Sequence, residues 1–309
     1  MGLLDGKVAI VTGAGRGIGR DHSLLLAREG ARIIVNDLGG SAAGEGTDQT
    51  PAEQVVKEIE AMGGEAAVNY ANVADFKACG EMVQQAVDTF GQLDILVNNA
   101  GILRDKMIFN MSEEEWDAVI AVHLKGTFNP TRHAAAYWRE KSKAGEPVAG
   151  RVISTSSPSG IYGNVGQANY GAAKAAIAAF TVIIAQELSR YGVTANAIAP
   201  TARTRLTELT FGAIPKPDAG FDRMDPANIS PLIAYLASDD AAGINGQVFA
   251  VTGGTIQLVQ GWTPIRTINK DARWEPAELV DAIEELVPGK KIQPEGMRRG
   301  AGAQAPKKE

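Results

Sequence analysis

The stretch "KVAIVTGAGRGIGRDHSLLLAREGA", residues 7–31, decides the fold. Its pattern predicts a short apolar strand, a glycine-rich turn and a helix. Glycine lets the backbone turn sharply and approach a phosphate closely, and the start of the following helix offers free N–H groups. The segment alone also fits an ordinary tight turn between a strand and a helix. The residues of this turn that we predict to bind a dinucleotide are Gly13, Arg16, Gly17, Ile18 and Gly19.

The next apolar run, "RIIVNDLGG" at residues 32–40, ends in an acid about twenty residues beyond the turn. A carboxylate at this place accepts hydrogen bonds from the adenosine ribose and repels a 2′-phosphate. Arg16 favours the opposite choice, because an arginine in the turn can bind that phosphate. A carboxylate facing a phosphate is costly, so Asp37 decides the question. The sequence predicts NAD as the cofactor.

Apolar runs and helical patterns alternate along the rest of the chain. This order predicts parallel strands joined by right-handed crossovers, with helices on both faces of the sheet. The predicted class is α/β, a Rossmann-type doubly wound parallel sheet of about seven strands. We expect one catalytic domain over residues 1–258. A C-terminal extension over 259–309 should contain a helix in "PAELVDAIEELV" (276–287) and a disordered tail.

Composition excludes several other kinds of protein. The chain has 309 residues with a net charge of −6 and no basic tract before its last residues, which argues against a nucleic-acid partner. Cys79 is the single cysteine, so no intrachain disulfide is possible, which suits the cytoplasm. The short apolar run at the N-terminus is no signal peptide, no run approaches the length of a membrane span, and no pattern of metal ligands stands out.

An alanine-rich segment, "SSPSGIYGNVGQANYGAAKAAIAAF" at 156–180, contains Tyr170 four residues before Lys174. Residues at this spacing share one helix face. A nearby ammonium favours the phenolate and lowers a pKa that is ordinarily about 10. Together with the positive charge of an oxidised nicotinamide, Lys174 is expected to make Tyr170 the base that takes the proton of a substrate hydroxyl. A half-exposed tyrosine beside a solvated lysine is the alternative.

The glycine spacing, "NNAG" at 98–101 and Y-x-x-x-K at 170–174 together resemble the short-chain dehydrogenase/reductase family over about residues 5–255. The resemblance implies that Ser157, thirteen residues before the tyrosine, holds the reacting oxygen. Ser156 and Ser159 are its competitors. The resemblance also implies a second role for Lys174, a hydrogen bond to the nicotinamide ribose. The further cofactor contacts that it implies are Asn72, Val73, Asn99, Ala100, Gly101, Ala202 and Thr204.

One position departs from the family pattern. Where the family has an asparagine in a pattern such as "VNLKG", this chain has "VHLKG", with His123. His123 either carries a proton path or fills space in the core, and the sequence leaves both roles open.

Further stretches, "IVNDLGG", "VHLKGTF" and "NNAGILRDK", resemble the (3R)-hydroxyacyl-CoA dehydrogenase part of peroxisomal multifunctional enzyme type 2, which is 17β-hydroxysteroid dehydrogenase type 4-like, and its bacterial relatives. The resemblance implies NAD-dependent oxidation of a 3-hydroxyacyl-CoA in fatty-acid or steroid side-chain β-oxidation by a homodimer or homotetramer. A 17β-hydroxysteroid dehydrogenase, an NADPH-dependent 3-ketoacyl reductase and a non-catalytic NAD sensor are the alternatives.

We expect residues 211–230 to form a lid with an apolar slot for the substrate. The basic side chains predicted to meet CoA phosphates are Arg203, Arg205, Lys216 and Arg223.

Overall fold

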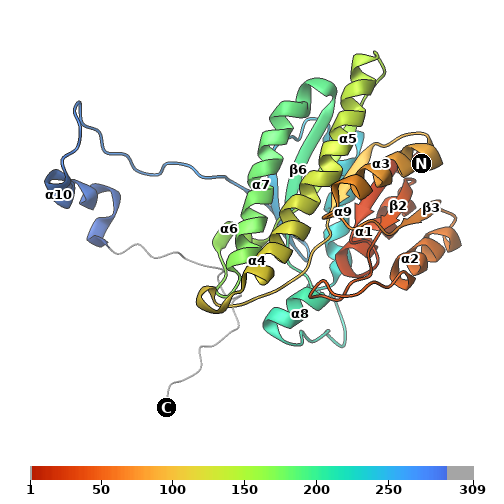
Figure 1. The fold of residues 1–309 in the computed structure, drawn as a ribbon, viewed down its shortest axis with the longest axis horizontal. Helices are drawn as coiled ribbons and strands as arrows, with labels where there is room; N and C mark the ends of the chain where they lie inside the picture. The colour runs from red at the N-terminus through yellow and green to blue at the C-terminus, as the bar shows by residue number, and fades with distance from the viewer. Residues whose placement is uncertain (1, 291–309) are drawn as a thin grey trace.

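The computed structural model describes residues 2–290, and its centre is one eight-stranded sheet (Figure 1). The strand order is β3-β2-β1-β4-β5-β6-β7-β8, parallel throughout except for the last pair. This confirms the predicted doubly wound α/β class. The strands are β1 (Val8–Thr12), β2 (Arg32–Asn36), β3 (Ala66–Asn69), β4 (Ile95–Asn98), β5 (Gly150–Thr155), β6 (Val193–Pro200), β7 (Val248–Thr252) and β8 (Thr255–Val259).

Helices cover both faces of the sheet, as its apolar strands require. Side chains alternate along β1: Ala9 and Val11 pack against α1, α2 and α9, whereas Val8 and Ile10 pack against α3, α5 and α7. The helices are α1 (Gly17–Arg28), α2 (Thr50–Ala61), α3 (Phe76–Phe90), α4 (Glu113–Ile120), α5 (Gly126–Lys143), α6 (Pro158–Tyr162), α7 (Ala168–Leu188), α8 (Arg205–Phe211), α9 (Ser230–Ala237) and α10 (Pro276–Leu286).

The sheet has one strand more than the sequence prediction. β8 pairs antiparallel with β7 across the two-residue turn Gly253–Gly254, and Gly253 has the positive φ of 53° that such a turn requires. The helical pattern of residues 113–141 is not one continuous α-helix, because a π-helical turn, η2 (Ala121–Lys125), joins α4 to α5.

Helix α7 is long and apolar enough, by length and composition, to cross a membrane, the one such helix within residues 2–290. It lies along β6, however, and buries one side, including Asn169 and Lys174, inside the protein. Core helices pass the same test of composition, so α7 is weak support for a span.

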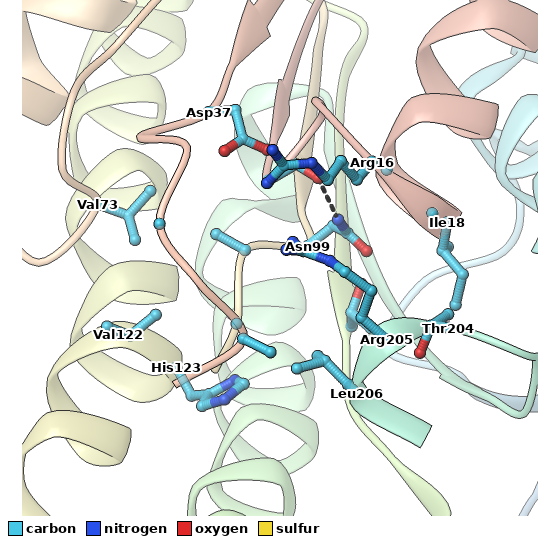
Figure 2. A pocket seen from close by; sticks show the side chains of 18 of the residues that line it. Arg16, Ile18, Asp37, Val73, Asn99, Val122, His123, Thr204, Arg205 and Leu206 are labelled. Atoms are coloured by element: carbon cyan, nitrogen blue, oxygen red, sulfur yellow. Dashed lines mark hydrogen bonds between the residues drawn. The ribbon is translucent and has the colours of Figure 1, made fainter. Parts of the chain in front are cut away.

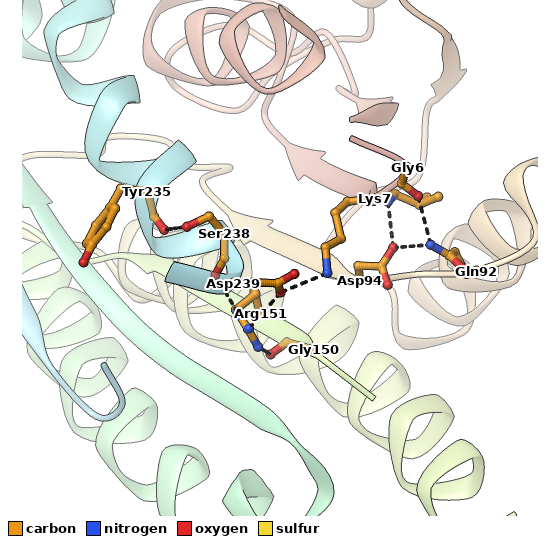
Figure 3. Close-up of polar contacts among 10 residues, drawn as sticks. Gly6, Lys7, Gln92, Asp94, Gly150, Arg151, Tyr235, Ser238 and Asp239 are labelled. Carbon is orange, nitrogen blue, oxygen red and sulfur yellow. Dashed lines mark hydrogen bonds and ion pairs between the residues drawn. The ribbon is translucent and has the colours of Figure 1, made fainter. Parts of the chain in front are cut away.

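Polar side chains tie the strand starts together at the edge of the sheet opposite the glycine turn (Figure 3). The Arg151 side chain is only 4% exposed and donates to the Ser238 carbonyl (3.2 Å) and the Asp239 carboxylate (3.3 Å). Lys7 pairs with the same carboxylate at 3.0 Å, before β1 begins. A buried cation with these partners holds the end of α9 to the starts of β1 and β5. The carboxyl ends of the same strands form the opposite edge of the sheet.

The chain beyond β8 leaves the sheet, and α10 lies apart from the main body (Figure 1). This confirms the predicted helix in residues 276–287. The predicted disordered tail lies outside the described residues, and the domain boundary after residue 258 stays a prediction.

Candidate active site

A cavity of about 400 Å³ opens where the strand order reverses between β1 and β4. In doubly wound sheets, ligands bind at this switch point, outside the carboxyl ends of the strands. The cavity is lined by all fifteen residues predicted to contact the cofactor: Gly13, Arg16, Gly17, Ile18, Gly19, Asp37, Asn72, Val73, Asn99, Ala100, Gly101, Tyr170, Lys174, Ala202 and Thr204.

The glycine turn is closely packed and fits a phosphate-binding loop. A Cβ on Gly19 would lie 2.1 Å from the Gly13 carbonyl oxygen, and one on Gly13 would lie 2.7 Å from the Ala100 Cα. Gly17 has φ +53° and borders the cavity at the start of α1, where the nearest atom to an added Cβ is a methyl of Thr204 at 3.7 Å. A bare helix start open to a cavity suits an anionic group.

Asp37 lies at the end of β2 on the wall of the cavity (Figure 2). One carboxylate oxygen accepts from the Gly15 N–H (2.7 Å) and the other from the Gly39 N–H (2.6 Å). Asp37 therefore holds the glycine turn in shape besides lining the cavity. Arg16, the competing residue, is drawn to Asp48 by an exposed ion pair of 3.1 Å.

Tyr170 is half-buried at the other end of the cavity, in the first turn of α7. Its side chain forms a hydrogen bond with Ser157, the N-cap of α6, which is not itself among the residues that line the cavity. The two competing serines are occupied elsewhere: Ser156 donates to the Lys174 carbonyl and Ser159 donates to Gln167, both at 2.7 Å. This geometry favours Ser157 as the partner of the tyrosine.

Lys174 lies one helical turn beyond Tyr170 and faces the same cavity. Its Nζ donates to the Thr155 carbonyl at 2.6 Å and lies 5.6 Å from the centre of the Tyr170 ring. Thr155 ends β5, so the backbone of the sheet fixes the position of the cation. The spacing of four residues predicted that the two side chains lie together, and both line this cavity.

The protein's own groups do not lower the pKa of Tyr170 as expected. Burial raises its pKa to about 12, the hydrogen bond with Ser157 opposes that rise, and the Asp105 carboxylate adds to it. Burial also lowers the pKa of Lys174 to about 7. Desolvation disfavours the charged form of each group, so in this pair it moves the two pKa values in opposite directions.

His123 lines the cavity from η2 and packs edge-on against Tyr170, with ring centres 5.1 Å apart. Its Nε2 lies 2.7 Å from the Ile102 carbonyl oxygen, and a Cβ on Gly101 would lie 2.4 Å from its ring. Burial, and secondarily the charge of Lys174, lowers the pKa of His123 to about 3. A neutral, tightly held ring favours the space-filling role of the two that the sequence left open.

A polar chain connects α8 to the start of α7. The Asp105 carboxylate accepts from Thr210 of α8 (3.0 Å) and from Gln167 (2.7 Å), and Gln167 accepts from Ser159 and Asn164. These contacts hold α8 beside the helix that carries Tyr170.

Sequence reasoning missed part of the cavity wall. The loop after β2, which gave no motif, folds over the cavity through Gly40, Ala42 and Gly44, and Ala42 accepts from the Leu103 N–H at 2.9 Å. Thr155 and Arg205 also line it. Thr155 could have been found from the sequence, because it lies two residues before Ser157. Arg205 was assigned to the CoA phosphates, not to this cavity.

Comparison with known proteins agrees with this geometry. Residues 7–211 match the short chain dehydrogenase family. The chain belongs to the short-chain dehydrogenase family. It is therefore an oxidoreductase. Members of the short-chain dehydrogenase family generally bind NAD or NADP.

This short-chain dehydrogenase is similar in sequence to two relatives and in structure to a solved protein. It is 47% identical to the hydroxyacyl-CoA dehydrogenase ChsB1 of Mycobacterium tuberculosis, over 93% of this chain and 90% of that protein. It is 43% identical to the peroxisomal multifunctional enzyme type 2 of Drosophila melanogaster, over 84% of this chain but only 40% of that enzyme. A crystal structure of a short chain dehydrogenase from Mycobacterium avium superposes with a TM-score of 0.83, at 52% identity, covering 95% of this chain and 98% of that one.

Proposed function

We propose that this short-chain dehydrogenase oxidises (3R)-3-hydroxyacyl-CoA to 3-ketoacyl-CoA with NAD. The observation that carries the proposal is that the glycine turn, Asp37 and the Tyr170–Lys174 pair line one cavity. The similarity to a hydroxyacyl-CoA dehydrogenase along nearly the whole chain supports the substrate class. Asp37 supports NAD, because its carboxylate would face a 2′-phosphate at the ribose position.

The chain's own side chains can position the alcohol and receive its proton. Ser157 and Tyr170 hold the substrate hydroxyl between them, and the phenolic oxygen takes the proton. Lys174, fixed on the Thr155 carbonyl, favours the phenolate by its charge and lies within reach of the nicotinamide ribose. When bound, the oxidised nicotinamide accepts the hydride from the carbinol carbon.

Exposed apolar side chains lie on three neighbouring segments near Tyr170: residues 105–109, residues 165–167 and the end of α8. The N–H of Lys106 donates to the Gly166 carbonyl (2.8 Å), and Asp105 contacts α8, so these segments are neighbours. Their outward apolar residues suit an acyl chain or another bulky apolar substrate: Ile108, Phe109, Val165, Leu209 and Phe211.

A substrate panel tests the proposal. Initial rates are measured with the (3R) and (3S) forms of short, medium and long 3-hydroxyacyl-CoAs and with 17β-hydroxysteroids, each with NAD and with NADP. We expect turnover of (3R)-hydroxyacyl-CoA with NAD. A strong NADP preference would support the 3-ketoacyl reductase alternative, turnover of the steroid alone the steroid dehydrogenase, and cofactor binding without any turnover the NAD sensor.

The proposal also covers location, assembly and domain division. A cytoplasmic location accords with the single cysteine, which is buried. A homodimer or homotetramer is proposed from the resemblance to the family. The division of the chain into residues 1–258 and 259–309 accords with the departure of the chain from the sheet after β8.

A further inference from the structure

The first residue of α8, Arg205, reaches into the cofactor cavity. Its backbone is fixed because the Thr204 side chain caps α8 by accepting from the Thr207 N–H (3.2 Å), and Thr207 in turn donates to the Ala202 carbonyl (2.8 Å). From this position the Arg205 side chain extends toward Arg16 and Asp37 (Figure 2). A capped helix start therefore aims a guanidinium across the cavity.

Arg205 differs from the neighbouring arginines in its partners. Arg203 pairs with Asp222 and donates to the Pro215 carbonyl at 3.1 Å, which corrects the expectation that it is free to meet CoA phosphates. Arg16 pairs with Asp48. The Arg205 side chain makes no hydrogen bond or ion pair with any residue from 2 to 290. Partial burial, and secondarily the charge of Arg16, lower the pKa of Arg205. The charge of Asp37 raises this pKa, but it has the smallest effect of the three.

Two guanidiniums converging on a cavity predict an anionic ligand, because each repels the other until an anion lies between them. The location identifies the kind of anion. Thr204, the cap of α8, faces Gly17 at the bare start of α1, with 3.7 Å between an added Gly17 Cβ and the threonine methyl. This helix start is where the diphosphate of a dinucleotide is held in doubly wound folds.

We propose that Arg205 binds the diphosphate of the dinucleotide from the α8 side, so that cofactor binding holds α8 over the substrate. The proposal rests on the proposed function, which supplies the dinucleotide. The other end of α8 is already attached to Asp105 through Thr210 at 3.0 Å. A dinucleotide contacted by Arg205 would therefore add a tie at the first residue of α8.

Binding of ADP-ribose, adenosine and NAD to Arg205→Gln, measured by calorimetry, tests the assignment without any turnover. Loss of a charge-assisted contact to the diphosphate should weaken ADP-ribose and NAD about 10- to 100-fold. Adenosine, which has no phosphate, should bind as to the wild type, and this also shows that the variant is folded. Arg205→Lys should recover part of the loss. Arg190→Gln is the matched control, since Arg190 is exposed and lies outside the cavity lining.

Unchanged ADP-ribose affinity in Arg205→Gln would overturn the proposal. If the KM for acyl-CoA rises instead, Arg205 serves the CoA phosphates, and if only NADP binding weakens, it serves a 2′-phosphate. A wild-type protein that binds neither NAD nor ADP-ribose would overturn the proposed function as well, so the two failures are distinguishable.

Discussion

Replacing Lys174 with methionine tests whether Tyr170 and Lys174 share a proton. The pKa of Lys174 is about 7 and that of Tyr170 about 12, and groups this close titrate as a pair. Above about pH 7 the pair has therefore lost one proton, which leaves the other proton shared between the amine and the phenol. Without Lys174, the phenol must ionise alone.

The size of the effect follows from the geometry. The ammonium lies 5.6 Å from the Tyr170 ring centre, where a unit charge is worth about 3 kcal/mol at an effective dielectric constant of about 20. This amounts to about two pKa units, or about a 100-fold smaller phenolate population at a given pH. We expect kcat for alcohol oxidation in Lys174→Met to fall about 100-fold below about pH 7, where Lys174 carries its charge.

The pH profile of NAD reduction is the assay. The wild-type kcat should rise through an apparent pKa near 7 and then level off, whereas that of the variant should still be rising at about pH 10, because burial raises the pKa of Tyr170 to about 12. ADP-ribose affinity checks that the diphosphate and adenosine end of the cofactor site is intact. A Lys174→Met enzyme that keeps the wild-type plateau would refute the idea that the two side chains share a proton.

Asp37→Ser removes the carboxylate that faces the ribose, so the ratio of kcat/KM for NADP to that for NAD should rise at least about tenfold; an unchanged ratio means that Asp37 only shapes the glycine turn. Thr210→Val breaks the contact of α8 with Asp105 and should raise KM for acyl-CoA about tenfold without moving the pH profile, and Thr210→Ser should restore it. His22 is buried against Ser230 and burial lowers its pKa to about 3. Between about pH 6.5 and 3 the unfolded chain therefore binds a proton that the folded chain does not, and stability falls as the pH falls. His22→Asn should reduce the slope of unfolding free energy against pH by about 1.4 kcal/mol per unit, measured by urea unfolding near pH 5, and an unchanged slope would exclude His22 as a contributor.

Much of the fold was predictable because local signals agreed with the global arrangement. The apolar runs of β1 to β7 and the glycine turn carry the periodicity and turn chemistry of a doubly wound sheet. β8 was missed although the pair Gly253–Gly254 is a two-residue hairpin signal, because the strand after it is largely exposed. The π-helical turn at η2 has no sequence pattern that distinguishes it from a continuous helix.

The site was predictable where the spacing of residues along a helix determines which side chains lie together. It was less predictable where burial sets a pKa or where a distant residue forms an ion pair. The spacing of four residues brought Tyr170 and Lys174 together, but only the packed structure shows that burial raises one pKa and lowers the other. Arg203 and Arg205 look alike in the sequence. The placement of Asp222, seventeen residues beyond Arg205, gives one of them an ion pair and leaves the other facing the cavity.

The role of the Tyr170 phenol is tested most directly by Tyr170→Phe, which removes one oxygen atom from the half-buried side chain. Its NAD and ADP-ribose affinities and its kcat with (3R)-3-hydroxyacyl-CoA are compared with those of the wild type. The account predicts unchanged cofactor binding and a kcat lower by about 100- to 10,000-fold at every pH, the usual contribution of a positioned general base. A phenylalanine variant that turns over at near the wild-type rate would contradict it.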